Sequence, residues 1–201
     1  MPAPPGSTAW WNLTVNLPEQ HERALASTRA YVAGVKPGQW HDPTPCAEYD
    51  VRALVNHVVS GNFWVTPLVG GSSIADVGDK YDGDVLGDDA LAAYERSAGE
   101  AAAAFNAPGA MEASVAVSYG PVPGELYAGH RFIDVLIHGW DLAQATGQDT
   151  TLDSELVETC REVVEPQAEL LKGSGMFGTD VKVPPDADPQ TRLLALLGRR
   201  A

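Results

Sequence analysis

Four long segments with helical spacing, separated by connections rich in Pro and Gly, restrict this 201-residue chain to an α-helical architecture. In these segments apolar side chains recur at intervals of three and four residues, or alanine dominates, and both patterns favour helix. The segments cover about residues 18–35, 51–69, 88–105 and 125–145. A brief alternation at Val115, Val117 and Tyr119 predicts one extended strand, and one strand cannot form a sheet. We therefore predict an all-α, antiparallel four-helix bundle.

Single residues mark the ends of these helices. Asp50 is a good N-cap for the second helix, Asp88 or Asp89 for the third, and Gly147 suits the position just after the fourth. The acidic segment 71–87, which carries Asp76, Asp79, Asp82 and Asp84, is expected to be a long connection.

The chain divides into three predicted parts. Residues 1–17 are rich in Pro, Gly and Trp and lack periodicity, so we expect an arm beside the domain. The bundle is predicted over residues 18–175, with a fifth helix that starts at Asp153 and is kinked or split by Pro166. Residues 176–201 are predicted to form a short C-terminal extension.

The composition excludes several functional classes. With 27 acidic and 13 basic residues the net charge is −14, so a phosphate backbone would be repelled and no nucleic-acid partner is expected. No apolar run approaches the roughly 18–20 residues that span a bilayer, and the first residues lack the features of a signal peptide. The two cysteines, Cys46 and Cys160, are no disulfide framework and fit a reducing compartment. We expect a cytoplasmic protein without a membrane partner, in which Trp10 and Trp11 either mark a homodimer interface or pack on their own domain.

The candidate chemistry lies on the fourth predicted helix. Asp134 and His138 are four residues apart and Asp141 follows three later, so all three share one helix face. A carboxylate and an imidazole one turn apart can converge on one metal ion. His57, on the inward stripe of the second helix together with Gly61, is the candidate third ligand.

Each of these residues also has a purely structural interpretation. His57 could be a hydrogen-bonded core histidine, and Asp134 with His138 could be an ordinary ion pair. Asp141 could orient His138, replace Asp134 as a ligand, or lie exposed near the end of the helix. His130 is on the same row, but it is too far from His138 to share one ion.

Four further residues with reactive side chains are expected to have no chemical role. His21 and His41 have polar sequence neighbours, and Cys46 and Cys160 have neither a basic neighbour nor a placed histidine.

Three stretches of the sequence together resemble a known family. They are TPCAEYDVRALVNHVVSGN, RFIDVLIHGWDLAQATGQ and VPPDADPQTRLLALLGR. The chain is similar, over about residues 20–200, to actinobacterial metal-binding proteins related to the N-terminal domain of mycothiol-dependent maleylpyruvate isomerase, in the DinB-like superfamily. The resemblance implies a DinB-like bundle that binds a divalent metal, usually zinc, through His57, Asp134 and His138.

The sequence departs from this family in two ways. The acidic ligand is usually Glu, and Asp134 is one methylene shorter, so Asp141 or a water could share the coordination. The isomerase also has a C-terminal domain that helps to bind mycothiol, and this sequence ends soon after the bundle, so the resemblance does not imply maleylpyruvate isomerisation.

The leading functional hypothesis is a metal-dependent enzyme that activates a low-molecular-weight thiol such as mycothiol for attack on a small-molecule electrophile. Asp141 would support His138, and Arg131 would bind an anion or orient a ligand. Zn²⁺ is the first choice of metal, but Ni²⁺, Fe²⁺ and Mn²⁺ suit the same donors. The alternatives are a metal-dependent hydrolase and a non-catalytic binding protein. Because an imidazolium cannot bind metal, metal affinity is expected to fall below about pH 6.

Overall fold

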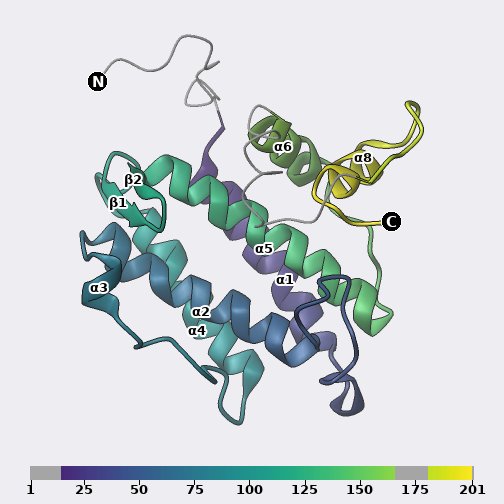
Figure 1. The fold of residues 1–201 in the computed structure, drawn as a ribbon, viewed down its shortest axis with the longest axis horizontal. Helices are drawn as coiled ribbons and strands as arrows, with labels where there is room; N and C mark the ends of the chain where they lie inside the picture. Colours follow the sequence, from purple (N-terminus) through teal and green to yellow (C-terminus); the bar gives the residue numbers. More distant parts are fainter. Residues whose placement is uncertain (1–14, 166–180, 201) are drawn as a thin grey trace. The chain divides into compact units, whose positions relative to one another are not determined.

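The computed structural model describes residues 15–165 and 181–200, and these residues fall into two compact units (Figure 1). The first unit, residues 16–151, contains four long helices: α1 (Leu17–Gly34), α2 (Val51–Val69), α4 (Ala90–Phe105) and α5 (Gly124–Thr146). It also contains the 3₁₀ turn η2 (Pro37–Gln39), the short helix α3 (Ile74–Val77) and the strands β1 (Ser114–Val117) and β2 (Gly120–Pro123). Helices α6 (Ser154–Val164) and α8 (Pro189–Leu196) belong to the second unit. The prediction of an all-α, DinB-like four-helix bundle is confirmed.

The ends of three helix segments are stabilised by residues that cap them. The carboxylate of Asp50 accepts a hydrogen bond from Ala53 N at the start of α2. The carboxylate of Asp89 accepts one from Ala92 N at the start of α4. At the other end of α5, Gly147 adopts a left-handed conformation with φ 66°, which glycine reaches without strain. These three boundaries match the sequence prediction.

Hydrogen bonds between the long helices show the relative directions of these helices. They join Thr28 to Val135 and Tyr31 to Gln148 between α1 and the α5 region, Asn62 to Ser97 and Thr66 to Glu100 between α2 and α4, and His57 to Asp134 and Asn62 to Arg131 between α2 and α5. Residue numbers rise together in the first two pairs, which are therefore parallel, whereas α2 and α5 are antiparallel. A parallel pair needs a connection that returns along the bundle, and segment 71–87 provides it (Figure 1).

Helix α5 is the most deeply buried helix of the first unit. Most of its residues are buried, and Phe132, Leu136 and Trp140 are almost completely buried. Helix α1 approaches α5 closely at Gly139, where an added Cβ would lie 2.2 Å from Thr28 Oγ1. The same Thr28 hydroxyl donates a hydrogen bond to Val135 O at 3.0 Å, so a hydroxyl takes the place that a side chain at position 139 would need.

The substitution Gly139→Ala is therefore expected to destabilise the protein by about 1–3 kcal/mol, because the new methyl group overpacks the α1–α5 contact. Gly99→Ala is the matched control, since Gly99 lies in α4 with nothing within 4 Å of an added Cβ. The control should gain about 0.5–1 kcal/mol from the higher helix propensity of alanine. Urea unfolding of the two variants checks the prediction, and equal shifts in both would contradict it.

The expectation of a single strand was wrong. The structure contains a two-stranded antiparallel hairpin in which β2 pairs with β1, with Val115 opposite Val122 and Ala116 opposite Pro121. Both valines are buried, and the positive φ of Gly120 allows the tight return of the chain. The second strand was missed because Pro121 and Pro123 depress strand propensity. The predicted long connection 71–87 contains the short helix α3, which begins with a capping box formed by Ser73 and Asp76.

Some sequence predictions fall outside the described residues. These are most of the N-terminal arm with Trp10 and Trp11, the kink at Pro166, and the start of the C-terminal extension. The three-part division of the chain stays a prediction. Within residues 15–165 and 181–200, none of the helices has the length and apolar character needed to cross a bilayer.

Candidate metal centre

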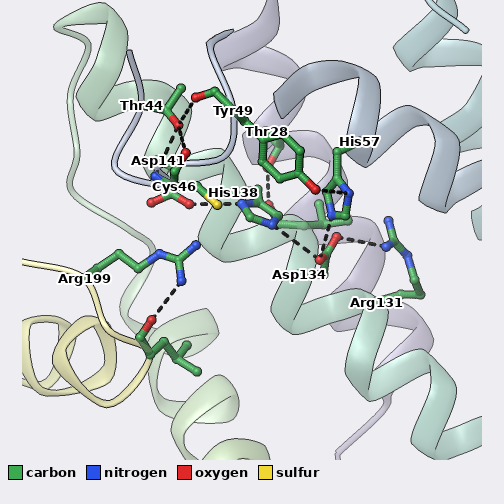
Figure 2. Close-up of polar contacts among 12 residues, drawn as sticks. Thr28, Thr44, Cys46, Tyr49, His57, Arg131, Asp134, His138, Asp141 and Arg199 are labelled. Atoms are coloured by element: carbon green, nitrogen blue, oxygen red, sulfur yellow. Dashed lines mark hydrogen bonds and ion pairs between the residues drawn. The ribbon is translucent and has the colours of Figure 1, made fainter. Parts of the chain in front are cut away.

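The three predicted ligands meet between α2 and α5. His57 projects from α2, while Asp134 and His138 project from successive turns of α5. His57 Nε2 lies 3.3 Å and His138 Nε2 3.5 Å from the same oxygen, Asp134 Oδ1 (Figure 2). Among the described residues, these three are the one group of His, Cys, Asp and Glu side chains whose ligand atoms all lie within 4.8 Å of one another.

The other nitrogen of each imidazole has its own partner. Asp141 Oδ2 lies 3.0 Å from His138 Nδ1, and the hydroxyl of Tyr49 lies 3.4 Å from His57 Nδ1. When each Nδ1 carries the proton, it donates to these oxygens, and each Nε2 then presents a lone pair toward Asp134 Oδ1. Asp141 is completely buried, so the interpretation as an exposed acid is wrong, and its contact supports the interpretation as a residue that orients His138.

Arg131 holds the other oxygen of Asp134. Its Nη1 donates to Asp134 Oδ2 at 2.9 Å, three residues along the same helix. Burial would raise the pKa of the Asp134 carboxyl, but the charge of Arg131, with smaller contributions from His138 and His57, outweighs it and holds the pKa far below its ordinary value. Asp134 is therefore an ionised donor at neutral pH.

Tyr49 is a member of the site that the sequence did not reveal. Its ring stacks on His57, with 5.2 Å between the ring centroids, and lies edge-on to His138 at 6.4 Å. The loop before α2 positions this ring, because the hydroxyl of Thr44 donates to the carbonyls of Cys46 and Tyr49. Burial raises the pKa of the Tyr49 hydroxyl, which therefore keeps its proton at neutral pH. No spacing rule connects a loop tyrosine to a histidine two turns into the next helix, so no sequence signal was available.

The remaining histidines lie apart from this cluster. His130 Nδ1 is 3.2 Å from the hydroxyl of Tyr119 in the hairpin, and the exposed His41 pairs with Asp50 at the start of α2. Although its sequence neighbours are polar, the side chain of His21 is completely buried and packs edge-on against Phe105.

Cys46 and Cys160 form no disulfide. Cys46 is half-buried in the loop before α2, whereas Cys160 is completely buried on α6. Burial raises the pKa of the Cys160 thiol far above its ordinary value, so this side chain is not a nucleophile.

The donor set fits a divalent transition metal. Bonds of about 2.0–2.1 Å to a tetrahedral zinc ion place neighbouring donor atoms about 3.3 Å apart, which is close to the two N–O distances of the cluster. Two imidazoles and one carboxylate also leave a fourth position for an exogenous ligand, as in catalytic zinc sites. The His57 side chain is 35% exposed and that of Asp134 20%, so a small molecule can reach the cluster from solvent.

Comparison with known proteins identifies a family and two relatives. A family model described as the mycothiol maleylpyruvate isomerase N-terminal domain matches residues 21–143, a range that includes all three candidate ligands. Two uncharacterized proteins of Mycobacterium tuberculosis, from strains CDC 1551 / Oshkosh and ATCC 25618 / H37Rv, are each 38% identical over 184 residues, which cover 89% of this chain and 95% of theirs. No solved structure matches the chain significantly. The chain belongs to the family of the mycothiol maleylpyruvate isomerase N-terminal domain.

Proposed function

We propose that this protein is a metal-dependent enzyme that activates a low-molecular-weight thiol, with His57, Asp134 and His138 as ligands of a divalent cation. The observation that carries the proposal is the convergence of two Nε2 atoms on one oxygen of Asp134 at 3.3 and 3.5 Å. Zn²⁺ suits this donor set best, and Ni²⁺, Fe²⁺ and Mn²⁺ are the alternatives. Mycothiol is the favoured thiol because the family description names it.

When bound, such a cation acts as a Lewis acid that lowers the pKa of a thiol, so that thiolate is present at neutral pH. The sulfur would then add to one carbon of an activated double bond, whose π bond breaks as the thiol proton passes to the neighbouring carbon, which gives an S-conjugate. Elimination of the thiol from this adduct after rotation about the new single bond would restore the double bond and complete a cis/trans isomerisation. The residues of the chain prepare this step. Asp141 holds the Nδ1 proton of His138, and Arg131 fixes the orientation of the Asp134 carboxylate.

The position of Asp141 supports the proposal of thiol activation rather than hydrolysis. A hydrolase needs a general base beside the open coordination position, and Asp141 was the one candidate in the sequence. Asp141 is completely buried and bound to His138 Nδ1, on the side of the ring away from the convergent Nε2. It is therefore placed to orient the imidazole rather than to take a proton from water.

The proposal is tested by metal analysis together with thermal shift. The purified protein is expected to hold about one equivalent of Zn²⁺, and mycothiol is expected to raise the melting temperature of the zinc-loaded form only. His57→Ala should abolish both effects, whereas His41→Ala should abolish neither, since the His41 side chain is 83% exposed and lies outside the cluster. A melting temperature that mycothiol raises equally with and without zinc would contradict thiol activation by the metal.

A further inference from the structure

Arg131 lies in a pocket on α2 that is built for it. Its side chain is 9% exposed and rests on Gly61, where an added Cβ would lie 2.4 Å from Nη1 and 2.7 Å from Cζ. These distances are far below any normal contact, so a residue with a side chain at position 61 would force the guanidinium to move. Gly61 shares a helix face with His57, which brings the pocket directly beside the candidate ligands.

The neighbouring residue anchors the same guanidinium. Asn62 is completely buried and accepts a hydrogen bond from Arg131 Nη2 at 3.0 Å. The orientation of the Asn62 amide is fixed in turn, because its Nδ2 donates to Ser97 Oγ, which donates to Tyr94 O on α4. The position of Arg131 is thus set by two helices, α2 and α4, in addition to its own.

This arrangement decides how Asp134 can bind a cation. Oδ2 of Asp134 accepts the hydrogen bond from Arg131, while Oδ1 faces both imidazoles. A carboxylate with one oxygen bound to a fixed guanidinium has only the other oxygen available, so it offers one donor atom instead of two. The coordination position of the cation that the second oxygen of a bidentate carboxylate would occupy therefore stays available to an exogenous ligand.

The same arrangement sets the charge of the centre. The positive charge of Arg131 cancels the negative charge of Asp134, and the two imidazole ligands are neutral when they bind metal. A divalent cation would therefore keep its double positive charge among its immediate neighbours, although the chain as a whole carries −14. Asp141 is separated from the cluster by the imidazole ring of His138.

We propose that Gly61 and Asn62 form a pocket that fixes Arg131, and that Arg131 is a positioning residue with two effects: it restricts Asp134 to one-oxygen ligation, and it makes the centre selective for an anionic exogenous ligand. This inference rests on the metal site of the proposed function and specifies the class of ligand that the site prefers, which is an anion such as a thiolate over a neutral donor of similar size.

The positioning effect is tested with Co²⁺ as the metal and a competing chelator as the readout of affinity. Gly61→Ala is expected to weaken Co²⁺ binding by about 10–100-fold, the usual effect of disturbing a group that orients a ligand. Gly99→Ala, the same exchange in a helix at a position with no neighbour within 4 Å, should stay within about twofold of the natural protein, since it leaves every residue around the cluster in place. Equal affinity in the natural protein and in Gly61→Ala would overturn the positioning role.

The charge effect is tested on the cobalt-loaded protein by visible absorption, with azide as the anionic probe and free imidazole as the neutral one. Arg131→Met is expected to lower the ratio of azide to imidazole affinity by about tenfold or more, since it removes a unit charge a few ångströms from the ligand. Arg131→Lys should retain most of the ratio while losing metal affinity as Gly61→Ala does, and it replaces the methionine variant if that protein does not fold. An unchanged azide-to-imidazole ratio in Arg131→Met would overturn the proposal. If Arg131→Met does not fold, unchanged metal affinity in Arg131→Lys would overturn it instead.

These experiments contain no thiol. If the natural protein shows azide selectivity that depends on Arg131 but no zinc-dependent response to mycothiol, the charge inference stands and thiol activation fails. If mycothiol raises the melting temperature of the zinc-loaded protein but the azide-to-imidazole ratio is the same in Arg131→Met, thiol activation stands and the charge inference fails. A protein that binds no Co²⁺ overturns both.

Discussion

Replacing Asp134 with alanine is expected to lower the Zn²⁺ affinity of the protein by more than about 100-fold, because the variant loses a ligand bond and the only anionic donor in the cluster. Asp141→Ala should lower the affinity less, by about 10–100-fold, because Asp141 touches His138 and not the convergent atoms. Asp88→Ala, the loss of an exposed carboxylate far along the sequence from the cluster, is the control and should leave the affinity unchanged.

Titration of the three variants against a competing chelator measures these affinities at one pH. The order of the effects is the decisive result. A greater loss in Asp141→Ala than in Asp134→Ala would mean that Asp141 is the ligand, which is the alternative that the sequence left open.

The second large effect concerns the stability of the protein in acid. His21 is completely buried, and neither of its ring nitrogens has a hydrogen-bond partner among the described residues. Burial, assisted by the charge of Arg131 and partly offset by Asp134, lowers the pKa of His21 to about 3. In the unfolded chain a histidine titrates near about pH 6.5, so between these two values the unfolded state binds more protons than the folded state.

The stabilisation that comes from keeping His21 neutral is therefore complete above about pH 6.5 and is lost as the pH falls toward 3. At about 1.4 kcal/mol per unit, the natural protein should lose about 3 kcal/mol between pH 7 and pH 4 that His21→Leu does not lose. The free energy of unfolding in urea, measured for both proteins across this range, checks the prediction. Parallel pH profiles would show that His21 is not the source of the acid sensitivity.

The helices of the first unit could be predicted because local signals and packing agree there. The predicted range 51–69 coincides with α2, and the predicted range 125–145 differs from α5 by one residue at each end. In both cases an apolar stripe of period 3.6 is bounded by residues that favour a helix end, such as Asp50 and Gly147. In the hairpin strand β2 the local signals and the packing disagree, because Val122 favours a strand and its two proline neighbours disfavour one.

The candidate site was predicted where it depends on spacing along one helix. Asp134, His138 and Asp141 share a face by periodicity alone, and the position of His57 opposite them follows from two inward stripes. The contacts of Tyr49 and Gly61 depend on which helices become neighbours and how closely they approach. Helix directions in the bundle are set by the course of the connections, and no pattern within a single segment contains that information.

The distance along the chain between the two halves of the cluster has a consequence for folding. Asp134 and His138 are brought together by one turn of helix, but His57 and Asp134 are 77 residues apart and meet only when α2 docks on α5. Such non-local contacts form late, after the chain has paid the entropy of closing the intervening loop. A metal ion therefore cannot serve as a nucleus for this fold in the way that it does in small zinc domains, and its binding should slow unfolding far more than it accelerates folding.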